Sequence, residues 1–189
     1  MNHLISKSRP CQRRTDFCKK YPSCPTTTDI PDSFVHGPVD GAIFRPLKPH
    51  YDSRGWLTEV FREDEMIENN LPAMGYVSQT EPGVVRGPHE HSWQSDFFVF
   101  LGPGDFEFYL WDIRSNSPTW GRKLKVVVGE SNPQSVIVPP GVVHAYKNIS
   151  DHSGWVMNFP NRLYGGEGHQ DPIDEVRYEN QPDSPFVID

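Results

Sequence analysis

Apolar and polar residues alternate over short stretches of this chain, and turn residues separate the stretches. In the run DFEFYLWD, Phe106, Phe108 and Leu110 fall on one face of a predicted strand. Tyr109 and Trp111 fall on its other face, because side chains along a strand point alternately to opposite sides. Glu107 shares this second face, and the alternation predicts a strand over the run.

The same reasoning predicts a series of strands and no long helix. Further strands are expected at 56–62, 96–101, 123–128, 135–138, 155–159 and, more briefly, 175–178. Gly102-Pro103-Gly104 predicts the loop of a hairpin joining 96–101 to the strand that follows. Residues 64–70 form a polar piece compatible with a helix. Many short strands without helical crossovers predict an all-β fold, a closed antiparallel double-sheet barrel that encloses a pocket.

Composition agrees with one such domain. The chain has 189 residues with 19 prolines and 15 glycines, which suits an all-β domain rich in turns. No apolar run approaches the roughly 18 residues of a membrane span, so no membrane partner is expected. The net charge of -7 argues against a nucleic-acid partner.

The first part of the chain differs from the rest. Residues 1–36 carry six Lys and Arg against three Asp, a net +3, which leaves -10 for the remainder. All three cysteines lie in this part, at Cys11, Cys18 and Cys24. Residues 1–38 are therefore predicted to be a flexible extension, with a transit peptide as the alternative, and 39–189 the barrel domain with a polar C-terminal tail. The absence of cysteine from the body favours a cytoplasmic location.

Two segments carry the candidate chemistry. In the first, His89 and His91 are two residues apart, so both imidazoles lie on one face of a strand, and Asp96 follows after a short turn. His144 arrives on a distant strand. Three nitrogens and one oxygen suit a divalent transition metal such as zinc, iron, manganese or nickel. The alternative is that the histidines are ordinary surface or core residues.

These segments resemble the two motifs of the cupin superfamily, a group of jelly-roll barrels also described as double-stranded β-helices. The first motif is matched by Gly83, His89, His91, Asp96 and Gly102, with Asp in place of the usual Glu. The second, Pro-x-Gly-x-x-His-x-x-x-Asn, is matched by Pro139, Gly141, His144 and Asn148. The resemblance implies the cupin fold and a metal held by His89, His91, Asp96 and His144.

A narrower resemblance covers residues 41 to about 178. Four stretches, DSRGWLTE (52–59), GVVRGPH (83–89), WDIRSNSPTWG (111–121) and IVPPGVVHAY (137–146), are similar to motifs of the dTDP-4-dehydrorhamnose 3,5-epimerase family. That family removes the proton beside the ketone of a nucleotide-linked 4-keto sugar and returns a proton to the opposite face. The resemblance implies a nucleotide-sugar substrate and a homodimer. It makes His89 the base with His144 close by, and Arg54, Glu59 and Arg86 contacts to the substrate.

Departures from the family pattern point to altered chemistry. The family's pocket lysine falls on Asp96, its catalytic tyrosine on Met157, and His91 replaces a glutamine. The C-terminal Asp that orients the basic histidine would lie in a segment that this chain lacks. A metal could take over the polarisation of the ketone, but His89 cannot both bind a metal and act as base.

Three interpretations therefore stay open. The first is an epimerase or isomerase of a nucleotide-linked deoxysugar, with Tyr146, Tyr164 or Glu107 moving the proton if His89 binds a metal. The second is a metal-dependent cupin enzyme, an oxygenase, lyase or sugar isomerase, on another small molecule. The third is a sugar-binding module without catalysis.

Overall fold

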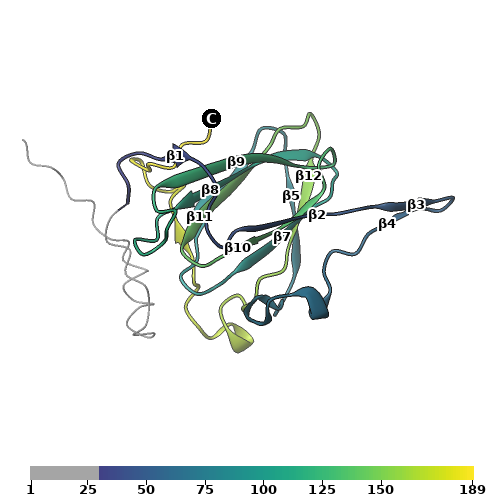
Figure 1. Cartoon of the computed structure of the whole chain (residues 1–189), viewed down its shortest axis with the longest axis horizontal. Coiled ribbons are helices and arrows are strands. Elements are labelled where there is room, and N and C mark those ends of the chain that lie inside the picture. Colours follow the sequence, from purple (N-terminus) through teal and green to yellow (C-terminus); the bar gives the residue numbers. More distant parts are fainter. Residues whose placement is uncertain (1–29) are drawn as a thin grey trace, which may run out of the picture.

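The computed structural model describes residues 30–189 and shows two facing β-sheets with a two-stranded arm (Figure 1). One sheet has the order β1-β9-β8-β11-β6-β13 and is called sheet A here; sheet B has the order β2-β10-β7-β12-β5. The strands of sheet A are β1 (Val35–His36), β6 (Val85–Glu90), β8 (Asp105–Asp112), β9 (Arg122–Gly129), β11 (Val142–Asn148) and β13 (Val176–Arg177). Those of sheet B are β2 (Ile43–Pro46), β5 (Tyr76–Thr80), β7 (Asp96–Phe100), β10 (Gln134–Val138) and β12 (Gly154–Asn158). The expected jelly-roll barrel is confirmed.

Alternation along β8 explains how the barrel is filled. Phe106, Phe108 and Leu110 face sheet B and are fully buried in the main core. Tyr109 and Trp111 point the other way, where their rings stack with centroids 5.6 Å apart. The two faces of β8 therefore serve two separate cores.

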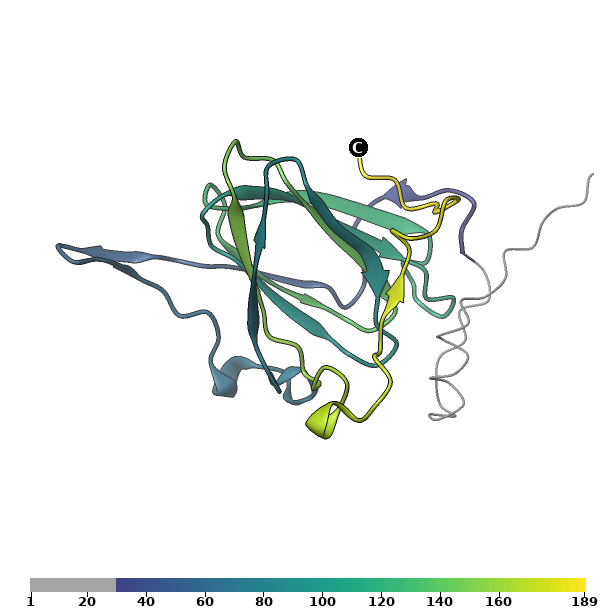
Figure 2. The ribbon, with the colours of Figure 1, turned by 180° about the vertical axis from the view of Figure 1, so that it is seen from behind.

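The C-terminal tail and the chain before the barrel cover the outer face of sheet A. Phe186 is buried with its ring 5.5 Å from that of Trp111 and 5.7 Å from that of Phe34. Lys123 Nζ lies 2.9 Å from a carboxylate oxygen of Asp189. In both views the tail runs beside β1 (Figures 1 and 2). β1 pairs in parallel with β9, so the segment just before residue 39 adds a strand to sheet A; residues 1–29 of the predicted extension lie outside the described residues.

The predicted hairpin around Gly102-Pro103-Gly104 is wrong. β7 belongs to sheet B, where it pairs with β10 and β12, while β8 pairs with β9 and β11 in sheet A. The Gly-Pro-Gly turn thus carries the chain from one sheet to the other. Turn residues mark where a strand ends, but they do not say whether the next strand pairs with it.

The strand expected at 56–62 is also shorter than predicted. It is β4 (Gly55–Leu57), which pairs with β3 (His50–Asp52) to form an arm that projects from the barrel (Figures 1 and 2). The chain then passes through two single-turn 3-10 helices, Glu63–Glu65 and Glu68–Asn70, in place of the helical piece considered for 64–70. A third such helix spans Glu167–His169. Among residues 30–189, no helix has the length and apolar character needed to cross a membrane.

Candidate functional site

Three strands from both sheets bring the four predicted ligand residues together. His89 on β6 is directly opposite His144 on β11 in sheet A, and Asp96 begins β7 in sheet B. His91 follows the end of β6. One potential ligand atom from each residue lies within 4.8 Å of the others. The cluster therefore lies between the sheets, as the spacing of its residues predicted.

A close approach of β6 and β11 makes room for the two facing histidines. Gly87 has a φ of +84°, and a Cβ there would come 2.6 Å from the carbonyl oxygen of His144. The pairing of the two strands shifts register between His144 and Tyr146, which is the irregularity of a β-bulge. Only glycine fits this conformation and spacing. The ring centroids of His89 and His144 are consequently 4.4 Å apart.

Asp96 presents one oxygen to the protein and the other to the histidines. Its Oδ1 accepts hydrogen bonds from the side-chain amides of Gln94 at 2.8 Å and Asn158 at 2.9 Å. Its Oδ2 lies 3.2 Å from His91 Nε2 and 3.0 Å from His144 Nε2. Neither Asp96 Oδ2 nor His144 Nε2 has a partner with hydrogen-bond geometry among the described residues, although both atoms are buried.

Backbone carbonyls fix the orientation of two of the rings. His144 Nδ1 donates to the carbonyl of Val142 at 3.1 Å, and His91 Nδ1 donates to the carbonyl of Asp174. The Nε2 atoms of both rings then face the cluster. This is the arrangement that orients histidine ligands in metal sites. These two buried atoms, which lie 3.0 Å apart without hydrogen-bond geometry, and the oriented rings fit a divalent transition metal.

Burial and mutual charge set the protonation of the cluster. Burial, reinforced by the neighbouring His144 and His91, holds the pKa of His89 well below its usual value, so this ring is neutral. Burial lowers the pKa of His91, but Asp96 outweighs it and raises that pKa to about 9. Burial raises the pKa of Asp96, but the two histidines outweigh it and hold that pKa well below its usual range. A neutral His89 can accept a proton or bind a metal.

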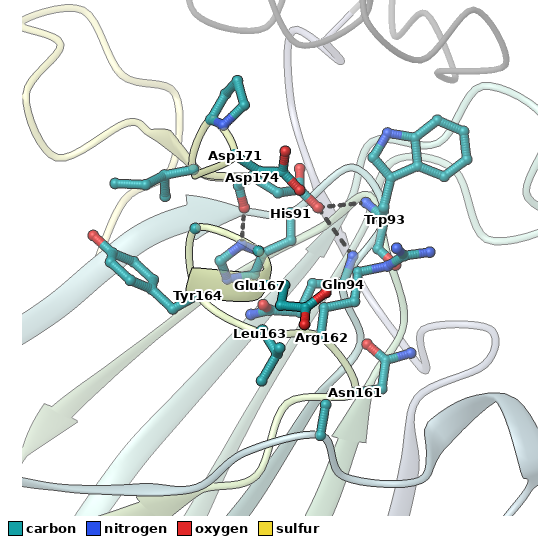
Figure 3. Close-up of a pocket in the computed structure, with 15 residues that line it drawn as sticks. His91, Trp93, Gln94, Asn161, Arg162, Leu163, Tyr164, Glu167, Asp171 and Asp174 are labelled. Atoms are coloured by element: carbon teal, nitrogen blue, oxygen red, sulfur yellow. Dashed lines mark hydrogen bonds between the residues drawn. The ribbon is translucent and has the colours of Figure 1, made fainter. Parts of the chain in front are cut away.

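A cavity of about 490 Å³ opens beside His91 (Figure 3). One wall is the segment of residues 161–174, called the strap here, and the other includes Trp93 and Gln94. The strap contributes polar and apolar groups. Its polar side chains along the cavity are those of Asn161, Arg162, Tyr164, Glu167, Asp171 and Asp174. A small ligand in this cavity would contact the edge of the cluster through His91.

The strap corrects the expectation that the chain lacks a C-terminal aspartate at the site. Asp174 reaches the loop after β6, although it contacts His91 and the backbone of that loop rather than His89. No sequence pattern pointed to Asp174, because 83 residues separate it from His91. Its contacts depend on where the chain after β12 crosses the barrel.

The predicted substrate contacts are spread over the molecule. Arg86 on β6 donates to Thr80 Oγ1 at 2.9 Å and to the carbonyl of Gln79 at 2.6 Å. Arg54 lies on the arm, with 88% of its side chain exposed and an ion pair to Asp52. Glu59 is exposed beyond the arm and pairs with Arg62. Within one chain, Arg54 and Glu59 are not brought to the cluster.

The candidates for moving a proton are also separated by the fold. Glu107 faces the outer side of sheet A, 2.8 Å from Lys125. Tyr146 is buried in the main core, and its hydroxyl is 2.8 Å from Ser78 Oγ. Tyr164 lines the cavity. Met157, at the position of the family's tyrosine, packs with Val99 on the outer face of sheet B, so this position supplies nothing to the cluster.

Comparison with known proteins agrees with the fold and the motifs. Residues 36–171 match the dTDP-4-dehydrorhamnose 3,5-epimerase family. The chain belongs to this family. A probable low-salt glycan biosynthesis epimerase of Haloferax volcanii is 39% identical over 132 residues, which are 69% of this chain and 82% of that protein. The chain is thus an epimerase- or isomerase-like enzyme by descent.

Solved structures share the same barrel. A dTDP sugar isomerase of Desulfovibrio desulfuricans has a TM-score of 0.67 and 24% identity, over 79% of this chain and 91% of that one. A 3,5-epimerase of Legionella pneumophila, solved with dTDP-4-keto-L-rhamnose, has a TM-score of 0.64 and 21% identity, over 82% and 81%. At this identity the likeness shows the fold alone.

Proposed function

We propose that this protein is an epimerase or isomerase of a nucleotide-linked 4-keto-deoxysugar, with chemistry altered from that of its family. Membership of the family supports the substrate class. The observation that carries the altered chemistry is the cluster of His89, His91, Asp96 and His144, where the family resemblance leads one to expect a lysine and a glutamine.

The reaction requires a base for the proton beside the ketone, stabilisation of the enolate, and an acid on the opposite face. The neutral His89 is suited to the first task if its lone pair is free. We propose instead that the cluster holds a divalent transition metal, zinc, iron, manganese or nickel, through His89, His91, Asp96 and His144. The two buried atoms without hydrogen bonds, Asp96 Oδ2 and His144 Nε2, support this assignment. Such an ion would supply Lewis-acid polarisation of the ketone.

With His89 bound to a metal, another group must carry the proton. Of the three candidates weighed from the sequence, Tyr164 is the one whose side chain lines the cavity beside His91. Glu107 faces away, and the Tyr146 hydroxyl is engaged with Ser78 in the core. Tyr164 is therefore proposed as the proton carrier of the metal-bound enzyme.

Solvent exchange tests the proposed reaction. In deuterium oxide, an enolising enzyme exchanges the hydrogens at C3 or C5 of dTDP-4-keto-L-rhamnose, and proton NMR shows which position loses its signal. We expect exchange with the wild type and its loss with His89→Ala. Asp151→Ala, which changes an exposed carboxylate in a loop after β11, is the control and should exchange like the wild type. No exchange by a folded wild type at either position would contradict the proposal for this substrate.

Metal content tests the cluster separately. Elemental mass spectrometry of protein purified without an affinity tag should find about one transition metal per chain, and His91→Ala should lose it. An empty wild type that no divalent ion can fill would restore His89 as a base in a metal-free epimerase.

The second candidate is a metal-dependent enzyme of another class, an oxygenase, lyase or sugar isomerase. The same departures favour it, since His91 and Asp96 complete the cluster while Met157 faces away from it. An iron-loaded protein that consumes oxygen with a small-molecule substrate, yet exchanges no sugar hydrogen, would select this candidate.

We also propose a homodimer, because the arm exposes apolar side chains that no other part of residues 30–189 covers. Tyr51 is 77% exposed, Leu57 67% and Trp56 52%. Light scattering should give twice the chain mass for the wild type and a lower mass for Leu57→Asp. A monomeric wild type would contradict the proposal. The cytoplasmic location stays a prediction.

A further inference from the structure

The carboxylate of Asp174 binds the loop that follows β6. Its Oδ1 accepts a hydrogen bond from the backbone N–H of Ser92 at 2.8 Å. Its Oδ2 accepts from the backbone N–H groups of Trp93 at 2.8 Å and Gln94 at 3.0 Å (Figure 3). Three successive amides thus converge on one carboxylate, an arrangement of charge-assisted hydrogen bonds that fixes the loop relative to the strap.

The main chain of Asp174 contacts the cluster itself. Its carbonyl accepts the hydrogen bond from His91 Nδ1. Since His91 directly precedes the three amides, side chain and main chain of one residue hold four consecutive residues of the loop. The strap is fixed on its other side by β13, where Val176 is buried and pairs with Glu90 on β6.

The same contacts extend to a second residue of the cluster. Gln94 gives its backbone N–H to Asp174 and its side-chain amide to Asp96 Oδ1, at 2.8 Å. If the carboxylate of Asp174 is removed, both the acceptor for His91 and the donor for Asp96 lose their fixed positions. Asp174 therefore acts on two of the four ligand residues, His91 and Asp96.

We infer that Asp174 is a positioning residue for the proposed metal centre, which sets the geometry of His91 directly and that of Asp96 through Gln94. This inference rests on the proposed function for the metal, but not for the sugar. Groups that orient metal ligands in this way typically contribute 10–100-fold to metal affinity.

Cobalt(II) is the probe, because its visible absorption reports the number and arrangement of ligands. Metal-stripped wild type, Asp174→Ala, Asp174→Asn and the control Glu175→Ala are titrated with Co²⁺, and unfolding temperatures are measured alongside. Glu175 directly follows the strap, and its carboxylate lies 2.7 Å from the Arg177 guanidinium. We expect Asp174→Ala to weaken Co²⁺ binding by about 10–100-fold and to change the absorption bands. Glu175→Ala should match the wild type.

Asp174→Asn keeps a side-chain oxygen that can accept hydrogen bonds from some of the three backbone amides. Its Co²⁺ affinity should therefore lie between those of the wild type and Asp174→Ala. This variant decides the outcome if Asp174→Ala does not fold. Wild-type affinity and bands in the folded Asp174 variant would overturn the inference. So would an equal loss in Glu175→Ala.

If the wild type takes up no Co²⁺, the metal proposal fails, and the positioning of His91 by Asp174 is tested by itself with imidazole NMR. The Nδ1 proton of His91 should be protected from solvent exchange in the wild type and unprotected in Asp174→Ala. Protection that survives in the variant would overturn it.

Discussion

Two buried aspartates in this barrel have opposite surroundings. Asp112, at the end of β8, accepts five hydrogen bonds: two to Oδ1 from the backbone and side chain of Arg114, and three to Oδ2 from Arg114, Ser117 and Thr119. Asp96, at the start of β7, accepts two amide hydrogen bonds on Oδ1 and leaves Oδ2 facing His91 and His144 without hydrogen-bond geometry. Both oxygens of Asp112 accept hydrogen bonds from their own loop, whereas only one oxygen of Asp96 accepts any.

This difference separates a carboxylate that stabilises the fold, Asp112, from one that is available to bind a ligand, Asp96. A buried polar atom without a hydrogen bond destabilises the folded state by about 1–3 kcal/mol, so native proteins keep few of them. The atoms left in this condition at Asp96 and His144 point toward each other across the two sheets. The barrel retains them where a ligand could satisfy them, while the loop around Asp112 ties up every oxygen.

Metal affinity should show the largest difference between the two aspartates. Asp96→Ala removes a proposed ligand, so Co²⁺ binding should weaken by more than the roughly 100-fold upper range of a residue that only orients ligands. Asp112→Ala should bind Co²⁺ as the wild type does, provided that it is folded at the measuring temperature. Equal losses in the two variants, measured by Co²⁺ absorption, would remove the distinction.

Folding stability should show the opposite order, with a larger loss in Asp112→Ala than in Asp96→Ala. Asp112→Ala removes the shared acceptor of the Arg114 guanidinium and of two half-buried hydroxyls, Ser117 and Thr119, which should lower the free energy of unfolding by about 2–3 kcal/mol. Urea denaturation of metal-free protein measures it. Asp96→Ala, in the same assay, should lower it by less, because only the two amides of Gln94 and Asn158 lose an acceptor, and the pKa of His91 falls once the carboxylate that raises it is gone. A larger loss at Asp96 would count against the comparison.

Acid should weaken the Asp112 network in a defined direction. Burial raises the pKa of Asp112, but hydrogen bonds from Arg114, Ser117 and Thr119 outweigh it and hold that pKa below its usual value. Because the pKa of Asp112 is lower in the folded than in the unfolded state, its ionised carboxylate stabilises the protein fully above the unfolded pKa of about 3.9. This stabilisation is lost as the pH falls through the folded-state pKa. The stability gap between wild type and Asp112→Asn should therefore be constant near neutral pH and shrink below about pH 4. A gap that persists in acid would show that charge is not its cause.

The smallest effect is expected at the exposed ion pair of the arm. Arg54 and Asp52 pair in solvent, so Arg54→Ala should not measurably change the unfolding temperature. If Arg54 contacts the nucleotide-sugar in the assembled enzyme, as the family resemblance implies, the KM for the sugar should rise nonetheless. An unchanged KM would leave Arg54 without the predicted role.

The sequence predicted the barrel and the cluster from local patterns. Alternation in DFEFYLWD places β8 at 105–112, as observed, and the two-residue spacing of His89 and His91 puts both rings on one side. Such patterns depend only on the geometry of a strand. The position of His144 followed from its motif, and the barrel brings it directly opposite His89.

The sequence-based predictions that failed, or were not possible, concern contacts between distant segments of the chain. The turn at Gly102-Pro103-Gly104 looks the same whether β7 pairs with β8 or crosses to the other sheet. The role of Asp174 depends on where the strap crosses the loop after β6, which no local pattern encodes. Tyr164 and Glu107 were equal candidates in the sequence, and only the side of the barrel on which each lies separates them.

The covering of Tyr109 and Trp111 by the tail has a practical consequence for handling this protein. Phe186 and Tyr178 bury these rings, so a protein truncated before Phe186 would expose stacked aromatic side chains on the outer face of sheet A. Exposed apolar patches of this kind promote association. The final residues, among them the apolar Phe186 and Ile188, are therefore best left in place when the protein is trimmed for crystallisation or expression.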